Sequence, residues 1–188
     1  MRIAAIVLAA GLSRRYGDGN KLTAPLNGKP LALHIADTLA GTAFFARIAI
    51  CQPGVSLAVA FKARGFTTVE NPDSTRGQAS SLVLGVQAAE AAGAEAVLIC
   101  LADMPFVTES HIVALLAAAE TADSVASTMQ GQPVPIPPAV FSRQHFPALL
   151  ALQGDKGARE LLASAQMIEA AAGELADFDT REDFTGNA

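Results

Sequence analysis

The sequence is short of basic residues and of long apolar runs, and each shortage excludes a class of protein. No apolar stretch reaches the ~20 residues that a membrane-spanning helix requires. With 13 lysines and arginines against 18 acidic residues, the net charge is −5, which is unlike the basic surface of a nucleic-acid-binding protein. We therefore expect neither a membrane protein nor a nucleic-acid partner.

Cysteine is also scarce, being represented only by Cys51 and Cys100, and each of them ends an apolar run. This position suits buried, reduced thiols better than a disulfide bridge. Because the sequence shows no pattern of a secretory signal peptide either, we expect a cytoplasmic location.

Charge is sparse along the chain, with 16% charged residues beside 51% hydrophobic ones over 188 residues. This composition excludes a disordered chain and predicts a large core. Because no internal repeat, low-complexity tract or linker is visible, we expect a single domain over residues 1–188.

Alternating segments predict an α/β fold. Residues 3–9 form an unbroken apolar run, which is typical of a strand buried on both faces of a parallel sheet. Further strands are predicted at 47–51, 67–70, 96–101 and 123–128, and helices at 31–39, 55–64, 82–92, 108–119 and 146–152. This alternation indicates a doubly wound, mostly parallel sheet flanked by helices, whose ligands bind beyond the carboxyl ends of strands. We expect His111, early in the fourth helix, at the surface and without a role.

The segment directly after the first strand combines small residues with cations, and it reads L-A-A-G-L-S-R-R-Y-G-D-G-N-K over residues 8–21. Small residues let backbone amides approach a polyanion, and Arg14, Arg15 and Lys21 offset its charge. The spacing matches neither G-x-x-x-x-G-K-[ST] nor G-x-G-x-x-G. The residues alone therefore indicate either a phosphate-binding loop or the glycine turn that any α/β protein contains.

The order L-A-A-G-x-S-x-R-x-G followed by N-K resembles the signature loop of the MobA-like nucleotidyltransferases, which include the molybdenum cofactor cytidylyltransferases, and more broadly that of sugar-nucleotide pyrophosphorylases. The resemblance extends over residues 3–184 and implies a Rossmann-like nucleotidyltransferase fold. It also implies that this loop binds the nucleotide, with Arg15 and Lys21 at its phosphates. The matching residues are Leu8, Ala9, Ala10, Gly11, Ser13, Arg15, Gly17 and Lys21. Tyr16 departs from the pattern, because the family usually has methionine there.

A second polar loop, N-P-D-S-T-R-G-Q-A-S-S, covers residues 71–81. Its own residues predict a loop that ends in Ser80 or Ser81 as the N-cap of the following apolar helix. The family has an N-P-x-x-x-x-G-x-x-x-S loop at this place, and the resemblance implies that Gly77 and Ser81 contact the nucleobase. Capping and nucleotide binding both stay open for this loop.

Two aspartates are candidate metal ligands. Asp103 follows the apolar strand 96–101 in L-A-D-M-P, where a carboxylate can bind Mg²⁺ that bridges phosphates, although an aspartate there more often caps a turn. D-M-P resembles the metal-binding segment of the family, which implies that Asp103 is the Mg²⁺ ligand. D-F-D-T-R-E-D near the end of the chain resembles the family's terminal D-x-D-T-x-x-D and implies that Asp179 is a second ligand, with helix capping as the alternative.

Two later segments resemble the acceptor side of the family. The four prolines within residues 131–141 exclude a central ladder and predict an edge or a wall of the cleft. Residues 153–162 contain G-D-x-G-A-R-x-L-L, a mark of the cytidylyltransferase branch. It implies that Asp155, Lys156 and Arg159 lie at the acceptor side, with a capped surface helix as the alternative.

The resemblance as a whole implies an enzyme that uses Mg²⁺ to transfer CMP from CTP to molybdenum-bound molybdopterin, giving molybdopterin cytosine dinucleotide and pyrophosphate. Arg15, Lys21 and Asp103 are the predicted catalytic residues. Ala10 favours CTP, because guanylyltransferases of the family usually have glycine there, although one methyl group discriminates weakly. GTP or another phosphorylated acceptor stays open, as does a carrier of molybdenum cofactor without chemistry. The expected partners are these substrates and a molybdoenzyme or its chaperone.

Overall fold

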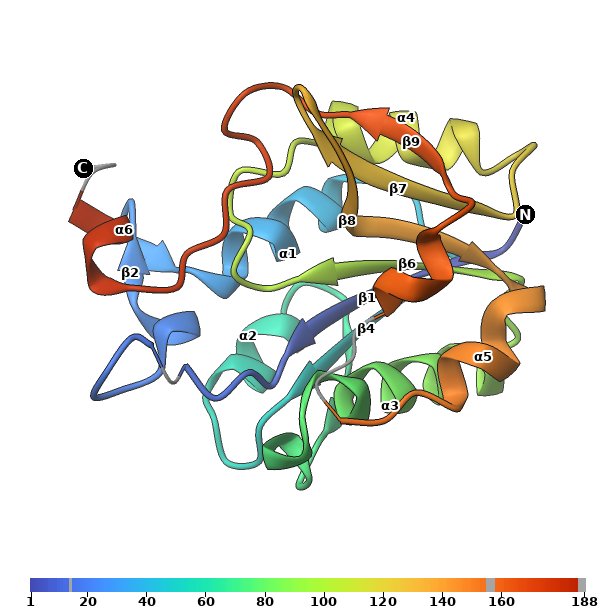
Figure 1. Ribbon diagram of the computed structural model, residues 1–188. Coiled ribbons are helices and arrows are strands. Elements are labelled where there is room, and N and C mark those ends of the chain that lie inside the picture. Colours follow the sequence, from blue (N-terminus) through green and yellow to red (C-terminus); the bar gives the residue numbers. More distant parts are fainter. Residues whose placement is uncertain (14, 155–157, 186–188) are drawn as a thin grey trace.

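The computed structural model describes residues 1–13, 15–154 and 158–185, and it is built around a mixed 7-stranded sheet (Figure 1). The strands are β1 (Ile3–Ala9), β4 (Ala46–Cys51), β5 (Thr67–Glu70), β6 (Ala96–Leu101), β7 (Ser124–Met129), β8 (Gln132–Ser142) and β9 (Gln166–Glu169). Their order is β5-β4-β1-β6-β8-β7-β9, and only β8 runs antiparallel to its neighbours. The predicted α/β fold with a mostly parallel sheet is confirmed.

Helices cover both faces of this sheet. They are α1 (Ala32–Gly41), α2 (Leu57–Lys62), α3 (Gln78–Ala91), α4 (Glu109–Ala118), α5 (Phe146–Leu150) and α6 (Arg181–Thr185). Short 3-10 turns span Lys21–Thr23, Ser74–Arg76, Arg143–His145 and Ala158–Leu162, and a small hairpin pairs β2 (Pro25–Leu26) with β3 (Lys29–Pro30). Buried side chains of α1, α2 and α4 pack on one face, and those of α3 and α5 pack on the other. Within the described residues, none of the helices could cross a membrane.

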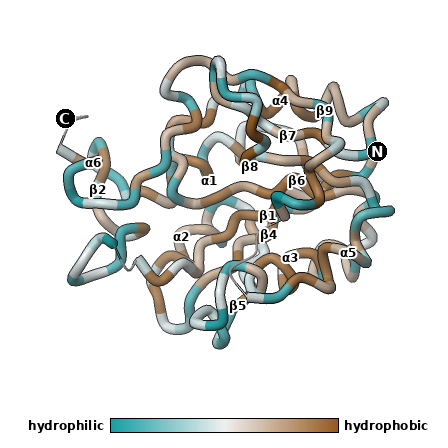
Figure 2. Tube along the Cα trace, in the orientation of Figure 1, coloured by the Kyte–Doolittle hydropathy of each residue, from teal (hydrophilic) through white to brown (hydrophobic). Residues whose placement is uncertain are grey.

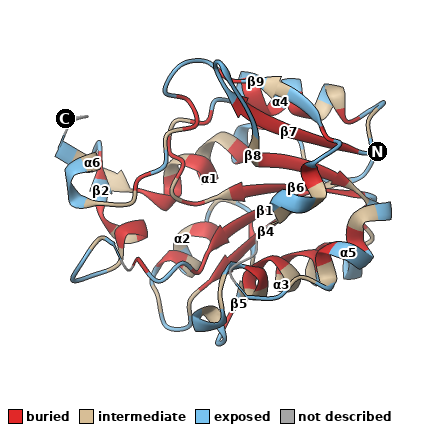
Figure 3. Ribbon diagram, in the orientation of Figure 1, coloured by how far each residue is buried: buried red, intermediate tan, exposed pale blue. Residues whose placement is uncertain are grey.

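Strand β1 is buried on both faces, as its apolar run predicts. Alternate side chains enter the two hydrophobic clusters, with Val7 on the α1 side and Ile6 on the α3 side. Figure 2 shows the strands around β1 as predominantly hydrophobic, and Figure 3 shows them as buried. Helix α3 approaches Ile6 very closely, because a Cβ atom at Gly85 would lie 2.6 Å from Ile6 Cγ2. A residue without a side chain is therefore favoured where this helix crosses the sheet.

The proline-rich segment forms the first part of β8, and its prolines stay out of the ladder with β6, as predicted. Strand β8 lies between β6 and β7, yet its ladder with β6 uses only residues 139–142, after the last proline. Its pairing with β7 is irregular across the prolines, with register shifts on both sides of Ser127. The prolines thus lie in the part of β8 that precedes its ladder with β6, where no regular hydrogen bonds to β6 are needed. Pro135 and Pro137 line a cavity, which confirms the predicted wall.

Helix α3 begins earlier than predicted, because Gly77 and not a serine is its N-cap. The positive φ of 100° at Gly77 turns the chain directly into the helix. Ser80 and Ser81 consequently lie within the first turns, where their hydroxyl groups serve other contacts. The prediction that one of them caps the helix was wrong.

His111 is buried, which contradicts the expected surface position. Thr108 caps α4 by accepting a hydrogen bond from the His111 amide, and the His111 ring lies 2.8 Å from Ser127 Oγ. Burial lowers the pKa of His111, and the nearby Glu174 carboxylate opposes this effect only in part. Because the Ser127 hydroxyl donates to the carbonyl of Pro138, the imidazole acts as the donor to Ser127 and links α4 to the sheet.

Candidate active site

The parallel strands β1, β4 and β6 end at one edge of the sheet, and the segments that follow them build the site. These segments carry residues 10–20 after β1, Gln52 after β4 and Asp103 after β6. The carboxyl ends of parallel strands collect polar side chains in this way, as the doubly wound fold predicts.

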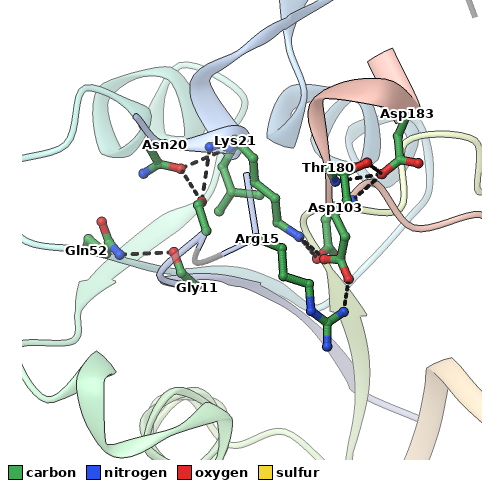
Figure 4. A network of polar contacts seen from close by, with 11 residues as sticks. Gly11, Arg15, Asn20, Lys21, Gln52, Asp103, Thr180 and Asp183 are labelled. Atoms are coloured by element: carbon green, nitrogen blue, oxygen red, sulfur yellow. Dashed lines mark hydrogen bonds and ion pairs between the residues drawn. The ribbon is translucent and has the colours of Figure 1, made fainter. Parts of the chain in front are cut away.

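Gln52 holds the start of the loop that follows β1. Its Nε2 donates hydrogen bonds to the carbonyl oxygens of Gly11 at 3.0 Å and Ala10 at 3.3 Å (Figure 4). The amides of Gly11 and Leu12 find no acceptor among the described residues, so they are free to bind an anion. Sequence reasoning missed Gln52, although a polar residue directly after a buried strand could have indicated it.

The far end of this loop is fixed by a serine and an asparagine. Ser13, at a positive φ of 51°, accepts a hydrogen bond from the Lys21 amide at 3.0 Å and lies 3.4 Å from Asn20 Oδ1. Asn20 in turn accepts from the Leu22 amide as the N-cap of the short turn that contains Lys21. These contacts set the backbone position from which the Lys21 side chain enters the site.

The predicted residues Arg15, Lys21, Asp103 and Asp179 form one connected group of ion pairs. Lys21 Nζ donates to Asp103 Oδ2 at 2.8 Å and to Asp179 Oδ1 at 2.6 Å, and Arg15 donates to the other oxygen of Asp179. In Figure 4 the Arg15 and Lys21 side chains point toward the carboxylates beside Asp103. The structure therefore brings together residues from the beginning, the middle and the end of the chain.

These ion pairs shift the pKa values of their partners. Burial acts to lower the pKa of Lys21, but the charges and hydrogen bonds of Asp103 and Asp179 outweigh it and raise that pKa. The hydrogen bond from Lys21, with the help of Arg15, lowers the pKa of Asp179 against the opposing effect of burial. Lys21 is therefore a permanent cation, and Asp179 is ionised at neutral pH.

Asp103 has spare capacity to bind a cation. Its Oδ1 is buried and has no hydrogen-bond partner among the described residues, while Oδ2 accepts a hydrogen bond from Lys21. Within the described residues no group of three His, Cys, Asp or Glu side chains could enclose a metal by itself. Mg²⁺ ordinarily uses one or two carboxylates and completes its shell with water and phosphate oxygens. The pair Asp103 and Asp179 fits that kind of metal and not an all-protein cage.

A cavity of about 270 Å³ opens beside these charges. It is lined by the predicted nucleotide-binding residues Leu8, Ala10, Gly11, Ser13, Gly77 and Ser81. Asp103 borders the same cavity, whereas Ala9 packs into the core on the other face of the sheet. The loop after β1 and the loop before α3 thus form the two sides of one pocket.

A second, more apolar cavity of about 410 Å³ adjoins the first. The two cavities share Leu8, Gln78 and Leu101 as common wall residues. Apolar side chains that include Leu82 and Phe141 line the second cavity, with Arg159 among its polar residues. The predicted acceptor residues Asp155 and Lys156, like the loop residue Arg14, lie outside the described residues.

The C-terminal segment holds the loop that carries Arg15. Arg181 donates hydrogen bonds to the carbonyl oxygens of Tyr16 and Asp18, and its guanidinium lies over the Tyr16 ring. Asp183 accepts hydrogen bonds from the amides of Asp179 and Thr180, which fixes Asp179 at the start of α6. At this helix start, Asp183 accepts the amide hydrogen bonds, whereas the Asp179 carboxylate accepts from Lys21 and Arg15; metal binding by Asp179 stays a prediction.

The comparison with known proteins agrees with this geometry. The sequence model of the MobA-like NTP transferase domain matches residues 5–171. The chain belongs to the MobA-like NTP transferase family. This MobA-like NTP transferase is similar to the purine catabolism protein PucB of Bacillus subtilis (strain 168), with 36% identity over 194 residues that cover 95% of this chain and 92% of PucB. The predicted family is confirmed.

Solved structures share the fold of this MobA-like NTP transferase. Rv0371c from Mycobacterium tuberculosis H37Rv has a TM-score of 0.81 and 22% identity, covering 100% of this chain and 97% of that one. A manganese complex of the same mycobacterial protein has a TM-score of 0.77 and 21% identity, with coverages of 100% and 98%. These similarities establish the doubly wound nucleotidyltransferase fold for the MobA-like NTP transferase described here.

Proposed function

We propose that this nucleotidyltransferase transfers CMP from CTP to molybdenum-bound molybdopterin, which gives molybdopterin cytosine dinucleotide and pyrophosphate. The observation that carries the proposal is the position of Asp103, Lys21 and Asp179 beside a pocket whose walls are the two predicted nucleotide loops. A pocket with cations and carboxylates at one end suits a ligand with a neutral base and a charged triphosphate.

The reaction needs no nucleophile from the protein. An oxygen of the acceptor's terminal phosphate attacks the α-phosphorus of CTP, and the bond between the α-phosphorus and the bridging oxygen breaks to release pyrophosphate. Lys21 and Arg15 exchange their carboxylate partners for phosphate oxygens when the triphosphate binds, and they then offset the charge on the leaving group. The free amides of Gly11 and Leu12 add neutral hydrogen-bond donors to the same phosphates.

Mg²⁺ is the proposed metal, held by Asp103 and Asp179 together with the nucleotide phosphates. When bound, it supplies positive charge that polarises the α-phosphate and screens the carboxylates from the triphosphate. The Oδ1 atom of Asp103, which has no hydrogen-bond partner among the described residues, and the position of the Asp179 carboxylate on the same Lys21 ammonium group support this assignment.

Cytidine is the proposed base because of Ala10. Its side chain is almost fully buried, and it lines the nucleotide pocket next to Gly11. A methyl group at this position narrows the space for a purine, an effect on the order of 1 to 3 kcal/mol. GTP is the alternative base, and the relative PucB does not decide between them, because its name refers only to purine catabolism.

The apolar cavity next to the nucleotide pocket is the proposed acceptor site. Its wall of leucine, isoleucine, proline and phenylalanine side chains suits a flat heterocycle better than a sugar phosphate or an erythritol phosphate, which would need more polar partners. Arg159 borders this cavity and provides positive charge for a phosphate of the acceptor. A molybdoenzyme or its chaperone is the proposed recipient of the product, in the cytoplasm.

Pyrophosphate release tests the proposal directly. The protein is incubated with Mg²⁺, purified molybdenum-loaded molybdopterin and either CTP or GTP. Release with CTP alone supports the proposal, and release with GTP alone supports the guanylyltransferase alternative. If neither nucleotide reacts, sugar phosphates and methylerythritol phosphate are tested as acceptors. Tight binding of the cofactor without any turnover would instead support a carrier.

A further inference from the structure

Asn71 is a fully buried polar residue, and it follows strand β5 at the entrance to the loop that borders the nucleotide pocket. Its Oδ1 accepts a hydrogen bond from the Asp73 amide at 2.9 Å. Since a backbone amide can only donate, this contact fixes which end of the Asn71 side chain is the oxygen. The Nδ2 group therefore points at the two serines of α3, and it donates to Ser80 Oγ at 2.9 Å and to Ser81 Oγ at 2.8 Å.

The two serines use their own protons differently. Ser80 donates its proton within the loop, with the Gly77 carbonyl at 2.7 Å as the nearer acceptor. Ser81 accepts from Asn71, but no residue in the described part of the chain accepts a hydrogen bond from its hydroxyl. Ser81 is buried and lines the 270 Å³ nucleotide pocket. The Ser81 proton is thus left for a ligand in that pocket.

We propose that Asn71 is a positioning residue that orients Ser81 as a hydrogen-bond donor to an acceptor atom on the edge of the bound nucleobase. Asn71 occupies one of the two lone pairs of the Ser81 oxygen and thereby restricts the rotation of the hydroxyl, whose proton has no acceptor among the described residues and is available to the pocket. The inference rests on the proposed function only in so far as the pocket binds a nucleoside triphosphate. It adds the direction of the hydrogen bond, from Ser81 to the base, and identifies Asn71 as the residue that orients Ser81.

Asn71→Asp is the most direct test, because it keeps the size of the side chain and the acceptor for the Asp73 amide. It replaces the Nδ2 donor by a carboxylate oxygen, which draws the Ser81 proton away from the pocket. The KM for CTP should rise about 5- to 50-fold, while kcat changes by less than about twofold, because the base contact is the same in the ground state and the transition state. The inhibition constant of inorganic triphosphate should not change, since that probe has no base.

Two serine variants supply the controls. Ser81→Ala removes the donor itself and should raise the KM for CTP by a similar factor. The double variant Asn71→Asp/Ser81→Ala should be no worse than Ser81→Ala alone, because Asn71 acts through Ser81. Ser80→Ala removes the other contact of the same Asn71 amide and should leave the KM for CTP within about twofold of wild type.

Several results would overturn the inference. Additive effects in the double variant, or a triphosphate inhibition constant that rises together with the KM for CTP, would mean that Asn71 only supports the loop. If the Asn71→Asp variant does not fold, an unchanged KM for CTP in the Ser81→Ala variant is sufficient to reject the inference. If the wild type releases no pyrophosphate from any nucleotide, the proposed function is wrong, but the inference on Asn71 can still be tested. Equilibrium dialysis then measures the dissociation constant of CTP for the wild type and the same variants, in place of the KM.

Discussion

Lys21 Nζ lies 2.6 Å from Asp179 Oδ1, although the two residues are 158 positions apart in the chain. The same ammonium group lies 2.8 Å from Asp103 Oδ2, so it joins the carboxylate after β6 to the one before α6. Without the positive charge of Lys21 between them, the carboxylates of Asp103 and Asp179 would repel each other. The lysine thus holds the proposed metal ligands together in the ligand-free protein.

Replacing Asp103 by asparagine tests the metal site. Asp103→Asn keeps the size of the side chain but removes the charge of the carboxylate that has an unpartnered oxygen. We expect Mn²⁺ binding, measured by electron paramagnetic resonance, to weaken at least about tenfold and turnover to fall about 100-fold. Asp123→Asn, at an exposed position before β7, is the matched control. Unchanged Mn²⁺ binding in Asp103→Asn would remove this residue from the metal site.

Replacing Gln52 by glutamate tests the loop that follows β1. Gln52→Glu removes the donor to the carbonyl oxygens of Ala10 and Gly11 and places a negative charge beside them. We expect nucleotide binding to weaken about tenfold, because the loop loses its anchor and the new charge repels phosphates. Gln87→Glu, on the exposed side of α3, adds the same charge without these contacts. Equal dissociation constants in calorimetric titrations of the two variants would contradict this role.

Replacing Ala10 by glycine tests the choice of base. Ala10→Gly removes a methyl group from the wall of the nucleotide pocket and should lower the ratio of kcat/KM for CTP to that for GTP by about tenfold. Ala9→Gly removes the same group from the adjacent residue, which packs into the core, so it should lower stability but keep the ratio. If the ratio stays the same in Ala10→Gly, other residues select the base.

The ion pairs of Lys21 predict how stability depends on pH. The pKa of Asp179 is lowered, so its stabilising contribution is present above its ordinary pKa of 3.8 and is lost as the pH falls through the lower folded value. The pKa of Lys21 is raised, so its contribution is present below 10.5 and is lost as the pH rises through the higher folded value.

Lys21→Met removes the Lys21 contribution and weakens that of Asp179, which keeps its pair with Arg15, so the free energy of unfolding should vary less with pH at the two extremes. Urea unfolding at about pH 3, 7 and 11 measures this effect. Lys62→Met, at an exposed position in α2, should keep the pH dependence of the wild type. A Lys21→Met curve parallel to that of the wild type would show that these pairs do not stabilise the fold.

Replacing Gly85 by alanine tests the packing of α3 on the sheet. The added Cβ would lie 2.6 Å from Ile6 Cγ2, a side chain in the buried core. We expect a loss of about 1 to 3 kcal/mol of stability, even though alanine favours helix formation. Gly41→Ala in α1 makes the same substitution against the flexible end of Glu109 at 3.4 Å, and it should lose less. Equal urea midpoints for the two variants would contradict the close approach.

Much of the fold could be predicted from local pattern. Strands β1 and β6 have the predicted limits, because long apolar runs bounded by polar residues mark buried strands directly. Strand β9 was not predicted, since its four partly exposed residues form a strand only by pairing with β7. The buried position of His111 was missed for the same kind of reason, because its partner Ser127 belongs to another element.

The sequence by itself determined the family, the α/β class and the residue types of the site, because each of these is written in contiguous motifs such as L-A-A-G and L-A-D-M-P. Tertiary structure alone decided that Lys21 lies between Asp103 and Asp179, that Gln52 anchors the loop and that Asn71 donates a hydrogen bond to Ser81. Such contacts join residues from separate segments of the chain. Their partners are set by the order and the register of the sheet, which no local stretch of sequence contains.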